Sequence, residues 1–296
     1  MNGSPDELLG LLRFAKQDPE DASRRLVLAD WLEEYGGPSD QVRAAVLRGQ
    51  ALHLREEQPH RDAWFRAFQD TGGVTMLDHW GMTFLSVSAK QGSRAPSLRH
   101  PAQYEWIASL RLFGAQERIP QDLAPFLASI NQLMLSHPRE RQPRLLLGRE
   151  FELSRLYHLV LDAEWIPFAW NWLADVSFTP RLRHLEFPLT DWSGRMLKRL
   201  SQLPLNSLHS LVLSCPAHWT RTCTPPRAPW WGQIRTLRLV GWQIMPRVVA
   251  WLLEPALVAQ LQTLDLRQTV PADQERAALT EAYGERVLFG PPLQGM

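Results

Sequence analysis

The chain has 296 residues, of which 45% are hydrophobic and 21% are charged, and its formal net charge at pH 7 is +1. This composition is typical of soluble, folded protein and argues against intrinsic disorder. A net charge near zero gives no global electrostatic preference for nucleic acid or for an anionic membrane. The length allows either two ordinary domains or one extended array of repeats.

The N-terminus and the cysteines indicate a cellular compartment. The stretch MNGSPDELLGLLRFAK lacks the basic start, apolar run and cleavage site of a signal peptide. No later segment approaches the roughly 18 uncharged apolar residues of a membrane span. The only two cysteines, Cys215 and Cys223, are too few for a disulfide-stapled secreted scaffold. We therefore expect a cytoplasmic protein without a membrane partner.

Two proline-containing motifs near the N-terminus predict helix starts. In SPDE, Ser4 can cap a helix, Pro5 suits its first position, and Glu7 can close a capping box. In DPED, Asp18 and Pro19 repeat this arrangement. The first helix is therefore predicted to end near Lys16.

The second helix is predicted to run from Pro19 to Tyr35, where Gly36 and Gly37 supply a left-handed stop. A third helix is predicted from Ser39 to Glu56. Spacings of three and four residues define the buried side of the second helix, on which Trp31 is expected to be largely buried. The residues of this side are Leu28, Trp31, Leu32 and Tyr35.

Three acidic residues, Asp30, Glu33 and Glu34, flank Trp31 and Leu32 in the sequence of this second helix. Paired carboxylates can act as acid and base when burial separates their pKa values. Nothing in the pattern predicts such burial, so we expect these residues on a solvated helix face.

The stretch DPEDASRRLVLADWLEEYG resembles the repeat-companion domain found at the N-terminus of many leucine-rich-repeat proteins of planctomycete bacteria. The resemblance covers roughly residues 4–55, and the RGEFIRLQ-like run that usually follows the glycine is represented here by QVRAAVLRGQAL. No catalytic residue is established for that family, so the resemblance implies architecture and no active site. It implies that residues 1–70 are a helical repeat-companion domain.

The rest of the chain repeats the pattern apolar-x-x-apolar-x-apolar at intervals of 25, 23, 26, 26, 26, 26 and 27 residues. This spacing lies within the range of leucine-rich repeats. The chain is therefore predicted to belong to the α/β class, with residues 71–296 forming a leucine-rich-repeat solenoid of eight or nine repeats around a parallel curved sheet. The copies begin at Met82, Ile107, Ile130, Leu156, Leu182, Leu208, Ile234 and Leu261, and a degraded ninth begins at Gly284.

The linkers between the copies predict a convex side that is partly helical and partly irregular. Helices are expected at residues 119–130, 193–203 and 245–261, whereas four prolines predict an irregular loop at residues 215–232. The Asn or Cys that usually bonds the backbone eight residues after the first Leu is missing. That offset holds Thr190 and Thr269, but elsewhere Glu164, Pro216 and Trp242.

Alternate strand residues are expected on the concave face, opposite the buried leucines. Both charge signs occur there, which disfavours a nucleic-acid groove because such a groove needs a continuous basic stripe. The mixture suits a protein surface. The candidate partner-binding residues are Arg111, His158, Asp162, His184, Glu186, Arg238, Asp265 and Arg267.

Four tryptophans fall 8 to 11 residues after the first Leu of their repeats. Trp192 and Trp242 occupy inward offsets and are expected in the core. Trp165 and Trp219 occupy offsets that allow them to face outward, where tryptophan can act as a binding hot spot.

Cys215, His218 and Cys223 could ligate zinc, but this spacing offers only three ligands. The alternative is two free thiols and a loop histidine. No phosphate-binding, hydrolase or metalloprotease motif occurs. We therefore expect no catalytic residue, cofactor or metal site.

These patterns predict a non-enzymatic scaffold that binds another protein through the concave face or the tryptophan-rich edge. One alternative is a sensor that recognises a small molecule or carbohydrate through its tryptophans. Another is a hydrolase with an unrecognised site, which would need a cluster of titratable residues with mutually shifted pKa values.

Overall fold

The chain has a mixed α/β fold with ten strands among the residues that the structure, a computed structural model, describes. It divides into two compact units, Met1–Leu156 and Tyr157–Met296. The domain boundary predicted near residue 70 differs from this division and stays a prediction. The described residues are 4–50, 59–60, 64–66, 74–78, 81–88, 105–113, 124–136, 153–161, 173, 181–189, 195–215 and 228–290.

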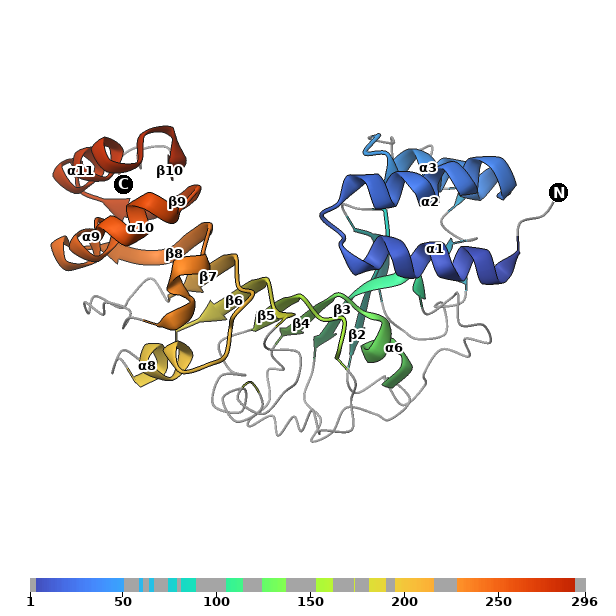
Figure 1. Ribbon diagram of the computed structural model, residues 1–296, viewed down its shortest axis with the longest axis horizontal. Coiled ribbons are helices and arrows are strands. Elements are labelled where there is room, and N and C mark those ends of the chain that lie inside the picture. The colour runs from blue at the N-terminus through green and yellow to red at the C-terminus, as the bar shows by residue number, and fades with distance from the viewer. Residues whose placement is uncertain are drawn as a thin grey trace. The chain divides into compact units, whose positions relative to one another are not determined.

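Unit 1 begins with three adjacent helices, α1 (Pro5–Gln17), α2 (Ala22–Tyr35) and α3 (Pro38–Leu47) (Figure 1). The Ser4 hydroxyl accepts a hydrogen bond from the Asp6 amide at 3.3 Å. This contact confirms the predicted cap of α1, which ends one residue after Lys16.

The predicted start of α2 at Pro19 is wrong. Asp21 caps the helix, because its carboxylate accepts a hydrogen bond from the Ser23 amide at 2.9 Å. Asp18 instead follows the last residue of α1. Both aspartates have the right chemistry for a cap, and Asp21, which directly precedes the first helical residue Ala22, takes the role.

The glycines at the end of α2 act through close approach and not through a left-handed backbone. The φ angles of Gly36 and Gly37 are −83° and −80°, so the predicted left-handed stop is wrong. A Cβ atom on Gly36 would lie 2.4 Å from the Leu32 oxygen, which explains the need for glycine. The left-handed residue is Gly49, with φ 79°, and it follows the early end of α3 at Leu47. The prediction that this helix continues to Glu56 is therefore also wrong.

The three helices share a hydrophobic core with the first parallel strands of unit 1. Trp31 packs against this core but is only partly buried, and Tyr35 is 36% exposed, so both are less buried than predicted. Asp30, Glu33 and Glu34 are exposed, as predicted. The buried residues of the core are Leu12, Ala15, Leu28, Ala29, Leu32, Ala44, Leu47, Met82 and Ala108.

The strands of unit 1 follow one another in chain order, and the equivalent leucines of the repeats face each other. Leu85 pairs with Leu110, and Leu110 pairs with Leu133. The first strand, which runs antiparallel to the second, was not predicted. The elements are β1 (Val74–Leu77), β2 (Thr83–Ser88), β3 (Ile107–Phe113), α6 (Ala124–Ser129) and β4 (Gln132–Ser136).

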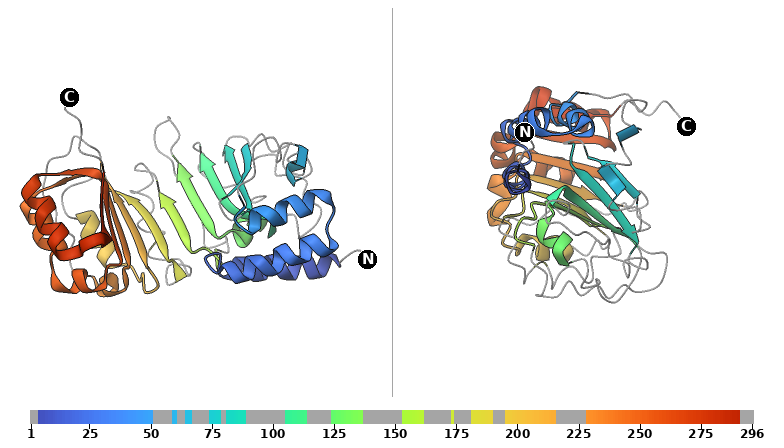
Figure 2. Two further views of the ribbon diagram at one scale, coloured as in Figure 1. Left: turned by 90° about the horizontal axis from the view of Figure 1, so that it is seen from above. Right: turned by 90° about the vertical axis from the view of Figure 1, so that its right-hand side faces the viewer.

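The strands of unit 2 are parallel throughout and also lie in chain order (Figure 2). Val287 pairs with Leu264 and Phe289 with Leu266, so a parallel strand lies within the stretch predicted to be a degraded ninth copy. The predicted strand positions are thus confirmed in both units. The strands are β5 (His158–Leu161), β6 (His184–Pro188), β7 (Ser210–Ser214), β8 (Thr236–Ile244), β9 (Thr263–Pro271) and β10 (Val287–Phe289).

The helices of unit 2 agree only in part with the prediction. The helix expected at residues 245–261 is interrupted at Leu253 and Glu254, because Pro255 cannot donate to the preceding turn. The irregular loop expected at 215–232 lies mostly outside the described residues. The helices are α8 (Arg195–Ser201), η5 (Pro229–Gln233), α9 (Pro246–Leu252), α10 (Pro255–Gln260), α11 (Asp273–Tyr283) and η6 (Gly284–Arg286).

Trp242 is buried in unit 2, which confirms its predicted core position. Its indole nitrogen donates to the Leu213 oxygen of the preceding strand at 2.9 Å. Thr269, at the equivalent offset of its own repeat, donates to the Leu266 oxygen at 2.8 Å. Trp242 and Thr269 therefore both donate to main-chain oxygens from the position eight residues after the start of their predicted copies. Thr190, Glu164, Pro216 and Trp192 lie outside the described residues.

Candidate functional site

One face of β5 to β9 carries two rows of mostly polar side chains, while the alternating leucines of the same strands are buried. The strand register aligns these rows from one repeat to the next. Arg267, two residues after Asp265 on β9, contacts the second row through hydrogen bonds to Asp265. We call this surface the polar strand face, and it consists of His158, His184, Ser210, Thr236 and Thr263 in one row, Val160, Glu186, Val212, Arg238 and Asp265 in the other, and Arg267.

Most of the predicted binding residues belong to this face. Arg111 lies instead in unit 1, where its exposed side chain donates to the Ser136 hydroxyl at 2.9 Å. Asp162, Trp165 and Trp219 lie outside the described residues. The predicted residues that lie together on the polar strand face are His158, His184, Glu186, Arg238, Asp265 and Arg267.

The first end of the polar strand face is rich in rings. The His158 and His184 ring centroids lie 5.4 Å apart, and the Tyr157 ring meets the His184 ring edge-on at 5.6 Å. A carboxylate oxygen of Glu186 lies 3.7 Å from Nε2 of His158. The pKa of Glu186 is lowered by the contact with His158, despite opposition from partial burial, and the nearby charges of His158 and Arg238 lower it further. Glu186 therefore presents a negative charge beside two histidines.

The second end is built around a buried carboxylate. The Asp265 side chain is 7% exposed, so the expectation that it is displayed on the surface is wrong. Nε and Nη2 of Arg267 donate to its two oxygens at 3.0 Å and 2.7 Å, and the Arg267 amide adds a bond of 3.1 Å. Arg238 faces Asp265 from β8, with Nε 3.5 Å from Oδ2. The hydrogen bond from Arg267 is the main cause that lowers the pKa of Asp265.

The polar strand face thus offers both cationic hydrogen-bond donors and anionic acceptors on neighbouring parallel strands. Among the described residues, no cluster of three or more His, Cys, Asp or Glu is arranged to hold a metal ion. Cys215 is buried, whereas His218 and Cys223 lie outside the described residues.

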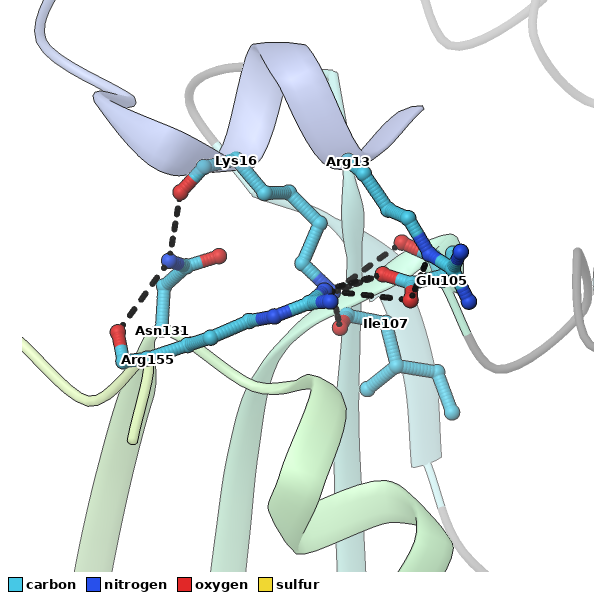
Figure 3. A network of polar contacts seen from close by, with 6 residues as sticks. All are labelled: Arg13, Lys16, Glu105, Ile107, Asn131 and Arg155. Carbon is cyan, nitrogen blue, oxygen red and sulfur yellow. Dashed lines mark hydrogen bonds and ion pairs between the residues drawn. The ribbon is translucent and has the colours of Figure 1, made fainter. Parts of the chain in front are cut away.

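A polar network in unit 1, which the sequence did not reveal, lies where α1 meets the residues before β3. Lys16 and Arg13 project from α1 toward Glu105 (Figure 3). Arg13 donates to the Glu105 carboxylate at 3.0 Å, and Nη1 of Arg155 donates to its two oxygens at 3.0 Å and 2.8 Å. Asn131 donates to the Lys16 carbonyl at 2.7 Å. Three cationic side chains thus converge on one carboxylate.

Burial disfavours the charged form of both groups at the centre of this network, but only for Glu105 do the neighbouring charges outweigh burial. Burial lowers the pKa of Lys16 to about 7 against the opposing charge of Glu105. Burial raises the pKa of Glu105, but the charges of Lys16 and Arg155 and the bond from Arg13 more than reverse this effect. The net pKa of Glu105 is therefore lowered, and its carboxylate is the fixed charge of the network.

A second buried cation, Arg43 of α3, lies with its guanidinium 3.5 Å from the centroid of the Trp106 ring. It donates to the Gly81 oxygen at 3.2 Å and to the Thr83 hydroxyl at 3.0 Å, and burial lowers its pKa to about 9. Helical spacing could have indicated both buried cations. Lys16 follows Leu12 by four residues, and Arg43 precedes Leu47 by four, so each lies on an apolar helix face.

None of the described helices is both long and apolar enough to cross a bilayer. Comparison with protein-family models and with curated proteins finds no match to the chain.

Proposed function

We propose that the chain is a non-enzymatic scaffold that binds another protein through the polar strand face. In this proposal a repeat-companion domain precedes a leucine-rich-repeat solenoid, and the polar strand face is the concave surface of that solenoid. The agreement between the repeat spacing and the paired leucines of successive strands supports this architecture.

The observation that carries the functional proposal is the alignment of charges of both signs along one strand face. Glu186, Arg238 and Arg267 are each partly exposed, with side-chain exposures of 44%, 38% and 57%. Contacts to His158 and Asp265 hold these side chains in defined orientations. Such preorganisation favours protein binding, because fewer side chains must be ordered when the partner arrives.

The charge pattern also bears on the class of partner. A nucleic acid favours a continuous basic surface, because its phosphates dominate the binding energy. Here Glu186 lies between the histidines and Arg238, which interrupts any such stripe. Alternating charge suits a protein partner, since electrostatic complementarity steers association and excludes wrong partners.

The test begins with pull-downs from lysates of the source cells with three forms of the chain. The first form is the wild type, and the second combines Glu186→Gln with Arg238→Gln. The third is a control that combines Arg247→Gln with Glu281→Gln, two exposed positions outside the polar strand face. Each double variant removes one positive and one negative charge, so the net charge does not change. Thermal unfolding of each form checks the fold.

Proteins that bind the wild type and the control, but not the face variant, are candidate partners. With purified components, we expect the face variant to associate more slowly and the wild-type association rate to fall with salt. Equal affinity of all three forms would exclude the polar strand face. A separate variant, Trp165→Ala with Trp219→Ala, tests the tryptophan-rich edge, for which an increased dissociation rate is expected.

A further inference from the structure

We propose that Arg238 and Arg267 form a carboxylate-binding site that recognises an acidic side chain of the protein partner. This inference rests on the proposed function and specifies its chemistry. Asp265 is the positioning residue of the site: it lies between the two arginines and orients both guanidinium groups from a buried position.

The geometry leaves most of the arginine donors available. A guanidinium group carries five N–H donors. Arg267 directs Nε and Nη2 to Asp265, while Arg238 approaches the same carboxylate only through Nε, without a well-formed hydrogen bond. Within the described part of the chain, neither guanidinium has another hydrogen-bond or ion-pair partner. Both side chains are partly exposed, so their remaining donors can reach a ligand.

The local charge balance favours a ligand with a single negative charge. Two arginines and one ionised aspartate leave one positive charge in excess. The hydrogen bonds from Arg267 keep the pKa of Asp265 low, so this balance holds at neutral pH. A carboxylate matches the excess charge and can accept two parallel N–H bonds from a guanidinium.

The surroundings of the arginines limit the ligand further. Val212 pairs with Arg238 and Leu288 pairs with Asp265, so apolar side chains flank the site on both neighbouring strands. Glu186 lies two strands from Arg238, which corresponds to roughly 10 Å. Its charge interacts with Arg238 and opposes a ligand group that carries two negative charges, such as a phosphate dianion, more than a single carboxylate. A carboxylate that approaches from the side away from Glu186 reduces this repulsion but does not remove it.

The test uses the full chain labelled with nitrogen-15 and follows the Nε–Hε signals of its arginines by NMR. The probe is a hexaglutamate peptide, and a hexaglutamine peptide is the uncharged control. The spectra of Arg238→Gln and Arg267→Gln assign the two signals. Arg247 of α9, which is exposed and lies outside the polar strand face, is the internal reference.

Hexaglutamate should shift the Arg238 and Arg267 signals in a saturable and salt-sensitive way, whereas hexaglutamine should leave them unchanged. Arg238→Gln should weaken hexaglutamate binding roughly tenfold or more, because charged hydrogen bonds are lost. Arg247→Gln should leave the affinity unchanged. Glu186→Gln should tighten binding by about two- to threefold, because a repulsive charge is removed.

Three results would overturn the carboxylate site. The first is the absence of shifts at Arg238 and Arg267 in the wild type, a result that needs no folded variant. The second is an equal shift at Arg247, which would indicate non-specific attraction. The third is tighter binding of inorganic phosphate than of hexaglutamate. If a partner still depends on Glu186 and Arg238 in the pull-down, the proposed function stands while this inference fails.

Discussion

The ammonium group of Lys16 lies 3.4 Å from the carboxylate of Glu105 and donates to the main-chain oxygen of the same residue at 3.1 Å. A third bond, of 2.8 Å, goes to the Ile107 oxygen (Figure 3). The Lys16 side chain is only 1% exposed, so water contributes little to its solvation. The network therefore replaces the hydration shell of a buried cation and attaches α1 to the beginning of β3.

We expect Lys16→Met to reduce the free energy of unfolding by about 2 kcal/mol at pH 7. Methionine removes the unfavourable burial of a charge, but it leaves the main-chain oxygens of Glu105 and Ile107 without this donor. The cost of leaving these two buried acceptors unsatisfied outweighs the relief. Glu105 itself stays paired with Arg13 and Arg155 in the variant. Equilibrium unfolding in urea measures the loss.

The matched control is Lys198→Met in α8, because Lys198 is exposed. Its effect should stay within about 0.5 kcal/mol, as for most surface substitutions. Equal effects at the two positions would contradict the assignment of Lys16 to a buried network.

The lowered pKa of Lys16 predicts a stability that rises with pH. Between about 7 and 10.5 the unfolded chain binds a proton that the folded chain releases, so the free energy of unfolding increases with pH in this range. Relative to Lys16→Met, the wild type should gain up to about 1.4 kcal/mol per pH unit. Urea unfolding at pH 7, 8 and 9 measures the difference. A difference that stays constant or falls above pH 7 would show that the buried amine remains charged.

The strands could be predicted from the sequence because burial repeats with the spacing of the leucines. Leu211, for example, faces Leu185 and Leu237 in register, so a single pattern fixed both the position and the direction of each strand. The start of α2 was harder to predict, because Asp18 and Asp21 are the same residue type and either could cap the helix. The antiparallel strand β1 has no counterpart in the repeat pattern and therefore gave no signal.

The polar contacts could be predicted only in part. Alternation along the strands correctly placed His158, Glu186 and Arg238 on one face. It could not reveal that two arginines cover Asp265, because burial there depends on side-chain pairing across strands. Lys16 and Glu105 are 89 residues apart, and only the folded chain brings them together.

Because Asp265 is buried, charge reversal at this position should lower the free energy of unfolding as well as the affinity for a partner. Asp265→Asn, a milder change, should reduce the free energy of unfolding by about 1 to 3 kcal/mol at pH 7, because it leaves Arg238 and Arg267 side by side. Glu281→Gln, at an exposed position of α11, is the control and should have little effect.

Acid should diminish the effect of Asp265→Asn. The pKa of Asp265 is lowered in the fold from its ordinary value of 3.8, so its stabilising contribution is complete above that pH and is lost as the pH falls through the lower folded value. The stability difference between the wild type and Asp265→Asn should therefore decrease below pH 3.8. Urea unfolding at pH 7 and at about pH 3 tests this, and an increase at the lower pH would refute the role of the ionised carboxylate.

Two glycines with a positive φ angle allow steric and conformational effects to be separated. Gly241 of β8 has φ 71° and Gly284 after α11 has φ 59°, but only the first is crowded. A Cβ atom on Gly241 would lie 2.1 Å from the Cys215 oxygen, whereas one on Gly284 would have no neighbour within 4 Å. Gly284→Ala should therefore cost only the conformational penalty of a positive-φ backbone that glycine alone adopts readily, about 1 to 3 kcal/mol. Gly241→Ala should cost several kcal/mol more, roughly 4 or above, because the backbone of β7 or β8 must move. Thermal and urea unfolding of the two variants compares them directly, and equal losses would show that β8 does not approach Cys215 this closely.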